Sequence, residues 1–439
     1  MGRYVASTAA EQQEMLNAAG YASFDELFAD IPEHVRLHQG LRIPEGLSEM
    51  EALARMEELA EKNTVFRHIF RGAGAYAHYI PAAVKSITSK EEFLTAYTPY
   101  QAEISQGVLQ SIFEFQTMVC DLTGLDAANA SVYDGATAAA EATAMCQERK
   151  RHTVLVSATT NPEVLKVIQT YCFGSNTPFQ VIPAAGGVTD SDALREALCE
   201  ETACFYVQQP NYYGILEDYQ SLSDAVHEKG AKFIMGSNPI ALAAIKSPSE
   251  YGADVAVGEG QPLGMPLAFG GPYLGFMAAS ASMTRKLPGR IVGQTTDHDG
   301  NRAFVLTLQA REQHIRREKA SSNICSNQAL CALTAGVYLS VMGKEGLKEA
   351  ALQCTAKAHY LQKALEEIGF SLRYRQPFFH EFVTTCPTDS SALMAALEKE
   401  GFLGGLPLEN GDILWCTTEK NTKQEMDALV SICKEVCGK

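Results

Sequence analysis

The sequence predicts an α/β protein whose large domain contains a mostly parallel β-sheet. The main observation is that short apolar segments alternate with helical patterns between residues 154 and 278, which is the rhythm of βαβ units. Two further observations set the domain boundaries. The first 65 residues are helical and polar, and the pattern of apolar segments changes again after residue 326. We therefore expect an N-terminal helical arm over 1–65, a large α/β domain over 66–326 and a small C-terminal α+β domain over 327–439.

The N-terminal arm is predicted from helix-start signals. Ser23 with Glu26 and Ser48 with Glu51 match the capping box, in which two side chains satisfy free amides at a helix start. A single amphipathic helix needs another surface to bury its apolar stripe. Such a stripe recurs at near-helical spacing at Met50, Leu53, Met56 and Ala60.

The two following domains are predicted element by element. A helix from about Ser105 to Leu122 ends at Gly124, a residue that suits the left-handed conformation after a helix. Helices then begin at Pro162 and cover 191–200, 219–229 and several stretches after about residue 327. Strands are expected at 154–157, 179–183, 204–208, 232–236, 254–258, 272–278, 370–374, 379–385 and 412–417.

Composition and charge exclude several classes of protein. The 439 residues include 46% apolar residues, enough for a large core, and carry a formal net charge of −16. Such a field repels nucleic acid and anionic membrane surfaces. No stretch approaches the roughly 18–20 apolar residues of a membrane span. We therefore expect neither a nucleic-acid partner nor a membrane partner.

The N-terminus and the cysteines indicate a cytoplasmic protein. The first residues lack the apolar run of a secretion signal. The 12 cysteines are scattered, with no C-x-x-C pair and no Cys/His cluster at zinc spacing. We expect reduced thiols and no metal site.

Glycine-rich segments supply candidate binding loops. The segment 72–77 resembles a dinucleotide fingerprint, but it follows a polar helical run rather than a strand and so fails the context of that motif. Gly135, Ala136 and Thr137 open an alanine-rich helix whose exposed amides suit a phosphate or carboxylate, although tight helix–sheet packing explains them equally well. The segment 258–275 has more glycines than a plain hairpin needs, which favours a functional loop.

Two polar segments supply further candidates. Tyr97, Tyr100 and Gln101 precede the long helix beside a Thr-Pro turn, and they either line a pocket or anchor the arm. The segment 308–319 is locally basic in an acidic protein, so it either grips carboxylates or forms a solvated face of Glu–Arg pairs. Its candidate residues are Arg311, His314, Arg316 and Arg317.

A family resemblance rests on three long segments, 96–142, 252–276 and 290–330, and on shorter ones at 71–81 and 415–430, so it spans nearly the whole chain. Together these segments resemble the first subunit of the glycine cleavage P-protein family, glycine dehydrogenase (decarboxylating). The family implies a pyridoxal-phosphate (PLP) enzyme of fold type I, the aspartate-aminotransferase fold. In many bacteria it is split into two homologous subunits, of which the second holds the cofactor on a lysine near the interface.

The resemblance implies an enzyme that is active only with its partner, subunit 2. In the family reaction glycine loses carbon dioxide on PLP, and the aminomethyl remnant passes to the lipoyl carrier (H) protein. In the cofactor-bearing half a lysine stands eleven residues before the proline of a Gly-Gly-Pro, and here that position is Gln261. Glutamine cannot form a Schiff base, and no lysine occurs between Lys246 and Lys286. We therefore expect PLP to be held by the partner subunit.

The resemblance also suggests roles for the candidate residues. We expect Tyr97, Tyr100 and Gln101, with the segment 258–275, to face a substrate cavity shared with the partner. The basic residues Arg311, His314, Arg316 and Arg317 are expected to hold the interface or guide an anionic group. Two alternatives stay open. One is a purely structural subunit, and the other is a self-sufficient PLP enzyme that uses another lysine, such as Lys232, Lys246 or Lys286.

Overall fold

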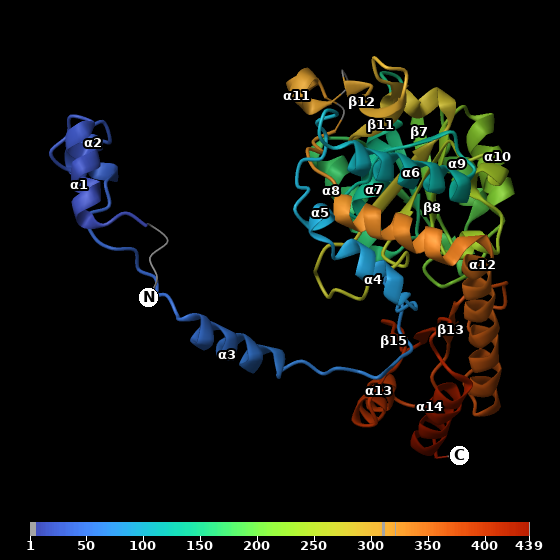
Figure 1. Ribbon diagram of the computed structural model, residues 1–439. Coiled ribbons are helices and arrows are strands. Elements are labelled where there is room, and N and C mark those ends of the chain that lie inside the picture. Colours follow the sequence, from blue (N-terminus) through green and yellow to red (C-terminus); the bar gives the residue numbers. More distant parts are fainter. Residues whose placement is uncertain (1–5, 310–311, 321, 439) are drawn as a thin grey trace. The chain divides into compact units, whose positions relative to one another are not determined.

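A computed structural model describes residues 6–309, 312–320 and 322–438. Contacts divide these residues into two compact units, 6–65 and 66–438 (Figure 1). The further division of the second unit at residue 326 stays a prediction.

The first unit consists of short helices with capped N-termini. At α3 the predicted capping box is confirmed, because Ser48 accepts the amide of Glu51 while the Glu51 carboxylate accepts the amide of Ser48. At α2 only half of it forms, since the Glu26 carboxylate accepts the amide of Ala22 rather than that of Ser23. The elements are α1 (Ala9–Ala18), α2 (Phe24–Leu27), η1 (Glu33–Val35) and α3 (Glu49–Ala60).

The apolar stripe of α3 is left uncovered within this unit. Met50, Leu53 and Met56 are 78%, 59% and 62% exposed, and no residue of the helix is buried. A contiguous apolar face of this kind marks a surface that another element or molecule covers.

A central sheet forms the core of the second unit. Among the described residues it has seven strands in the order β2-β10-β9-β8-β7-β3-β4. All neighbours from β9 to β4 are parallel, whereas β10 runs antiparallel to β9 and β2. The predicted α/β fold with a mostly parallel sheet is confirmed. The strands are β2 (Ala127–Ala128), β3 (Thr153–Ser157), β4 (Phe179–Ile182), β7 (Thr202–Gln209), β8 (Lys232–Ser237), β9 (Val255–Glu259) and β10 (Gly275–Ala279).

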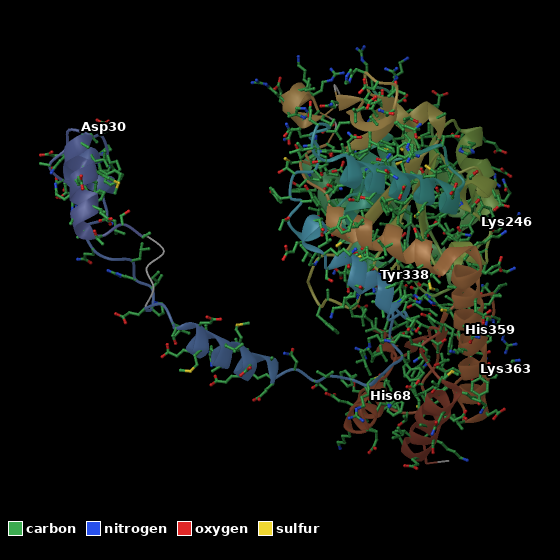
Figure 2. All side chains as sticks on the ribbon, viewed as in Figure 1. Asp30, His68, Lys246, Tyr338, His359 and Lys363 are labelled. Atoms are coloured by element: carbon green, nitrogen blue, oxygen red, sulfur yellow. The ribbon has the colours of Figure 1, made fainter. Side chains whose placement is uncertain are left out.

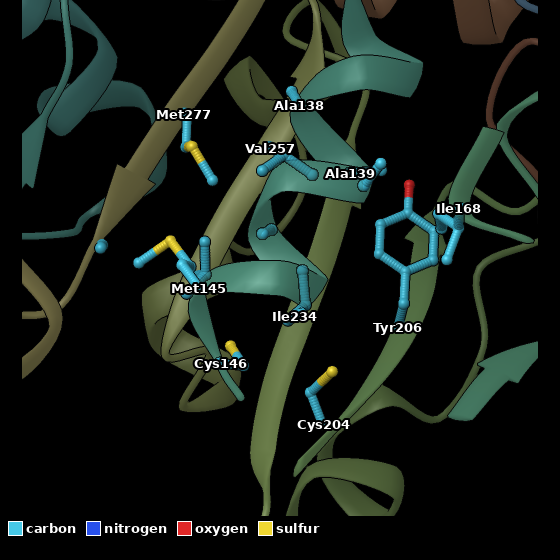
Figure 3. Close-up of a cluster of buried hydrophobic side chains, with 14 of the residues drawn as sticks. Ala138, Ala139, Met145, Cys146, Ile168, Cys204, Tyr206, Ile234, Val257 and Met277 are labelled. Carbon is cyan, nitrogen blue, oxygen red and sulfur yellow. The ribbon is translucent and has the colours of Figure 1, made fainter. Parts of the chain in front are cut away.

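Helices cover both faces of this sheet. On one face α7 (Gly135–Met145) and α8 (Pro162–Gly174) pack their small and aliphatic side chains against Ile234 and Val257 (Figure 3). On the other, α9 (Ser191–Ala197) and α10 (Tyr219–Glu228) cover Phe205 and Phe233. Strands buried on both faces are mostly apolar, which is why they stand out in the sequence.

The remaining helices and short elements complete the second unit. The long helix α6 (Gln106–Thr123) ends, as predicted, at Gly124, whose φ is 72°. A hairpin of β11 and β12 was not predicted. The other elements are β1 (His68–Ile69), α4 (Ala82–Thr88), α5 (Glu91–Leu94), β5 (Ala184–Ala185), β6 (Val188–Thr189), η2 (Ala241–Ala243), η3 (Pro248–Tyr251), η4 (Ala281–Lys286), β11 (Ile291–Thr296), β12 (Arg302–Thr307), α11 (Gln313–Arg316) and η6 (Arg317–Lys319).

The C-terminal segment begins with a bent helix, α12 (Ala329–Glu367). It breaks at Gly343, where φ is 60° and ψ is −176°, so that Tyr338 lies on one half and His359 and Lys363 on the other, which runs in a different direction (Figure 2).

The small sheet that follows has the order β13-β16-β15. The predicted strands at 379–385 and 412–417 are confirmed as β13 and β16. The predicted strand at 370–374 is wrong, because only Leu372 makes a bridge there, to Thr384. The elements are β13 (Glu381–Thr384), α13 (Ser390–Lys399), β14 (Phe402–Leu403), β15 (Leu406–Pro407), β16 (Ile413–Cys416) and α14 (Lys423–Val436).

Candidate functional site

A cavity of about 370 Å³ opens at the carboxyl ends of β7, β8 and β9, beside the first residues of α7 and α8. Ligands of open α/β proteins bind at this edge of the sheet. Three carboxylic acids line the cavity, Asp134, Glu163 and Glu259, and among the described lining residues none is a lysine, arginine or histidine. The lining residues are 72–76, 134–136, 161, 163–164, 206, 208, 236–239, 258–259, 262 and 273.

The carboxylate of Glu259 lies at the end of β9 and is held by backbone amides. One oxygen accepts the amide of Gly135 at 3.0 Å, and the other accepts those of Gln261 at 2.9 Å and Leu274 at 3.1 Å. Burial raises the pKa of Glu259 to about 7, and the charge of Asp134 adds to this shift, although the three amides oppose it. Sequence reasoning missed this acid.

Gln261 is fully buried and both ends of its amide are bonded. Its oxygen accepts the amide of Tyr76 at 2.9 Å, and its nitrogen donates to the carbonyls of Tyr76 and Met265, each at 2.9 Å. The side chain therefore fastens the segment around Tyr76 to the turn after β9, and it is absent from the described lining of the cavity.

A second buried acid supports the same segment from the C-terminal sheet. Glu381 accepts the amide of Ala73 at 2.6 Å and the hydroxyl of Tyr76 at 2.8 Å. Burial raises the pKa of Glu381 to about 7 against these hydrogen bonds, and burial with the nearby acid raises that of Tyr76 well above its usual value. No sequence motif pointed to Glu381, and the segment 72–77 was noted for its glycines rather than for Tyr76.

Three residues nearby are of types that bind metal ions. Candidate ligand atoms of His78, Cys354 and Glu419 lie within 4.8 Å of one another. They are bonded to each other, because the Glu419 carboxylate meets Nδ1 of His78 at 2.7 Å and the thiol of Cys354 at 3.4 Å. A buried hydrogen-bond network explains this cluster, and the absence of a metal site stays a prediction.

The predicted substrate residues lie away from this cavity. Tyr97 and Tyr100 line a second hollow of about 470 Å³, whereas Gln101 is exposed outside it. Tyr100 is fixed, since its hydroxyl donates to Asn327 at 2.5 Å and its ring lies 4.2 Å from the guanidinium of Arg290. Tyr97 is 88% exposed.

The residues of the predicted basic cluster that the structure describes form an exposed face. Arg311 lies outside the described residues. His314 is half exposed and 3.8 Å from Glu312, which also lies 3.4 Å from Arg290. Arg316 and Arg317 are exposed in α11 and η6. The role of the cluster stays a prediction.

Two of the three amides of the predicted anion cradle are engaged within the chain. The amide of Gly135 donates to Glu259, and that of Thr137 donates to Asp134 at 2.7 Å. Gly135 and Ala136 line the cavity, and Thr137 is buried behind them. The sequence left two interpretations of this helix start, an anion-binding site and tight helix–sheet packing. Features of both are present, because a carboxylate of the chain binds here and the helix packs closely on the strand end.

Comparison with solved structures first defines the class of protein. The fold is that of fold-type-I PLP-dependent enzymes, as predicted. An aspartate aminotransferase from Thermus thermophilus aligns with a TM-score of 0.59 at 14% identity, covering 84% of this chain and 99% of that one. An alanine–glyoxylate aminotransferase from Nostoc sp. aligns at 0.60 and 17%, covering 85% and 96%.

Closer matches define the family. The chain belongs to the glycine cleavage system P-protein family, whose model matches residues 2–433. A crystal structure of an inhibitor-bound glycine decarboxylase (P-protein) aligns with a TM-score of 0.92 at 42% identity, covering 99% of this chain and all of that one. Probable glycine dehydrogenase (decarboxylating) subunit 1 from Geobacillus kaustophilus and that from Moorella thermoacetica are each 49% identical, with 98% of both chains covered.

The cavity does not fit the PLP that this fold implies. An imine needs a primary amine, and the expected position holds the buried amide of Gln261. The end of β8, where an acidic partner for the ring nitrogen is expected, has neither Asp nor Glu, since the strand ends in Ser237 and Asn238 follows it. The helix start that would receive the phosphate already holds the Glu259 carboxylate.

Among the helices of the described residues, none combines the length and the apolar character needed to cross a membrane.

Proposed function

We propose that this chain is one subunit of a two-subunit glycine decarboxylase and that it is active only with a partner, subunit 2. Relatives matched over nearly their whole length carry the name glycine dehydrogenase (decarboxylating) subunit 1. In this proposal the complex releases carbon dioxide from glycine and passes the aminomethyl group to the lipoyl carrier (H) protein.

The observation that carries the proposal is the engagement of Gln261. We infer that PLP is held by the partner subunit, because no amine-bearing side chain is among the described residues that line the cavity. At the position expected for the lysine, the side chain of Gln261 instead holds Tyr76 in place. When bound, PLP supplies an electron sink for the decarboxylation.

The self-sufficient alternative has little support from the lysines that it would use. Lys232 pairs with Asp254 at 2.8 Å and Lys286 pairs with Glu148 at 2.8 Å. Lys246 lies 5.4 Å from the centre of the Tyr251 ring. Within the described part of the chain, no lysine lines the cavity.

In the complex this chain contributes walls and an interface. Tyr97 and Tyr100 suit a shared substrate cavity, because a fixed tyrosine beside an exposed one offers a rigid, amphipathic contact surface. We also expect Gln101 and the segment 258–275, whose Phe269 is 87% exposed, to face the partner. We assign His314, Arg316 and Arg317, with Arg311, to holding the partner or guiding an anionic group.

Reconstitution tests the proposal. The two subunits are purified separately and then mixed with PLP and the carrier protein, and glycine-dependent release of carbon dioxide is measured. Each subunit alone should be inactive, and the mixture should be active. Tyr97→Ala should lower turnover by about tenfold or more while leaving assembly intact, because a displaced cavity wall misplaces the substrate. Tyr79→Ala, a change at an exposed tyrosine outside the hollow, is the control.

Two outcomes would count against the proposal. Activity of this chain alone would support the self-sufficient alternative. Full activity of Tyr97→Ala, together with that of Tyr100→Phe, in a normally assembled complex would support a structural subunit.

A further inference from the structure

The cavity has an unusual polar end. At the start of α7, where an α/β protein commonly binds an anion, the chain supplies a carboxylate of its own. We propose that Glu259 is a built-in ligand that fills the anion-binding position of this cavity and thereby excludes phosphate compounds and other small anions. This inference holds whether or not the proposed decarboxylase function is correct.

The hydrogen-bond pattern is that of a bound anion. Both oxygens of Glu259 are used, and the three donors come from three separate places in the chain, namely the helix start at Gly135, the turn at Gln261 and the residue before β10 at Leu274. Backbone amides converging on two carboxylate oxygens form a preorganised oxyanion site. These donors therefore have no need of an external ligand.

Close packing shuts the same position sterically. A Cβ atom built on Gly135 would lie 2.7 Å from the amide nitrogen of Glu259 and 2.9 Å from its Cα and Cβ atoms. The end of β9 therefore packs directly against the start of α7. A phosphate cannot reach the Gly135 amide unless Glu259 moves. Of the next two residues of the helix, Thr137 has its amide bonded to Asp134, while Ala136 lines the cavity.

Charge acts in the same direction. An entering anion would meet the carboxylates of Glu259, Asp134 and Glu163, with no cationic side chain among the described lining residues. The raised pKa of Glu259, caused by burial and by the charge of Asp134, reflects how poorly this end of the cavity tolerates additional negative charge.

The test compares anion binding by the full-length chain and its variants. Thermal unfolding is followed during titration with formate and with inorganic phosphate, at constant ionic strength set with chloride. Wild type should show no saturable stabilisation. Glu259→Ala should unfold at a lower temperature, and formate should restore most of that loss in a saturable way because its carboxylate satisfies the three freed amides. Phosphate should also bind this variant.

Two further variants keep the test decisive. Glu163→Ala removes another acid of the same cavity. Because Glu163 pairs with Lys166 at the surface, formate should not raise the unfolding temperature of this variant. Glu259→Gln keeps the position filled and should bind neither anion. Saturable phosphate binding by wild type, detected independently by ³¹P line broadening, would overturn the proposal even if Glu259→Ala does not fold. Failure of formate to stabilise folded Glu259→Ala more than Glu163→Ala, or phosphate binding by Glu259→Gln, would also overturn it.

Discussion

Single side chains decide what this cavity can do. Gln261 keeps the position of the expected lysine but serves structure, since its three hydrogen bonds of 2.9 Å join Tyr76 and Met265. The carboxylate of Glu259 occupies the position where an external anion would be expected, although it is a side chain of the protein itself. The site therefore resembles a cofactor pocket in shape and differs from one in chemistry.

The buried amide of Gln261 should be costly to remove. Gln261→Met conserves volume but strands the amide of Tyr76 and the carbonyl of Met265, while the Tyr76 carbonyl keeps the amide of His78. We therefore expect unfolding in urea to require about 1–3 kcal/mol less free energy. Gln220→Ala is the matched control, because this glutamine bonds Asp224 on an exposed helix face and should change stability by less than about 0.5 kcal/mol. Equal stabilities for the two variants would show that the hydrogen bonds of Gln261 are unimportant.

The acid Glu381 should make stability depend on pH. Its pKa is raised by burial from 4.5 to about 7, so the folded state keeps a proton that the unfolded chain loses in this range. Stability should therefore fall as pH rises from about 4.5 to 7 and level off above, by at most about 1.4 kcal/mol per pH unit for one proton.

Urea unfolding of wild type and Glu381→Gln across this pH range checks the sign. The variant should have a flatter profile, while Glu163→Gln, at an exposed acid, should follow wild type. The assignment would be refuted if the free energy of unfolding of wild type increased with pH through this range, with the same slope as that of Glu381→Gln.

At the scale of elements, the bend in α12 rests on one residue. Gly343 adopts φ 60° and ψ −176°, a conformation that is essentially restricted to glycine. Gly343→Ala should lower the free energy of unfolding by about 1–3 kcal/mol. Gly336→Ala changes an unstrained position of the same helix, where an added Cβ would meet open space, so it should be neutral or stabilising by up to about 1 kcal/mol. Chemical denaturation of both variants decides, and equal effects would contradict this account of the bend.

Elements with a strong local signal were predictable from the sequence. Strands β3, β7, β8 and β9 are buried apolar runs between turn residues, and α6 ends at a glycine. The hairpin of β11 and β12 was missed because most of its residues are partly buried or exposed and so lack a clear apolar pattern. The stretch 370–374 has strand-like residues, but its pairing with β13 is limited to one bridge, in which the amide of Arg373 donates to Val383 and the carbonyl of Ser371 accepts the amide of Thr385.

The chemistry of the site was less predictable for a related reason. The loss of the lysine at Gln261 could be recognised because it is local to one motif. The partners of Glu259 and Glu381 could not, because Gly135 lies 124 positions from Glu259 and Ala73 lies 308 positions from Glu381. Only the fold brings such residues together.

At the scale of the whole molecule, we expect the N-terminal unit to take part in assembly. Its helix α3 exposes Met50, Leu53 and Met56, and burial of an apolar side chain contributes about 1.5–3 kcal/mol. Replacing all three with serine should therefore weaken binding to the partner subunit by more than about 100-fold, as measured by calorimetry. The control replaces Arg55 and Glu58, an exposed pair on the same helix, with serine. Unchanged affinity of the triple variant would place the stripe outside the interface.

The most direct test of the central claim asks which subunit carries the cofactor in the active complex. The assembled enzyme is incubated with PLP, reduced with borohydride to fix any imine, and digested for peptide mapping. The pyridoxyl group should be found on a lysine of the partner subunit and on no lysine of this chain, with glycine-dependent release of carbon dioxide lost in proportion to labelling. A stoichiometric adduct on this chain, above all one whose formation parallels the loss of activity, would contradict the account.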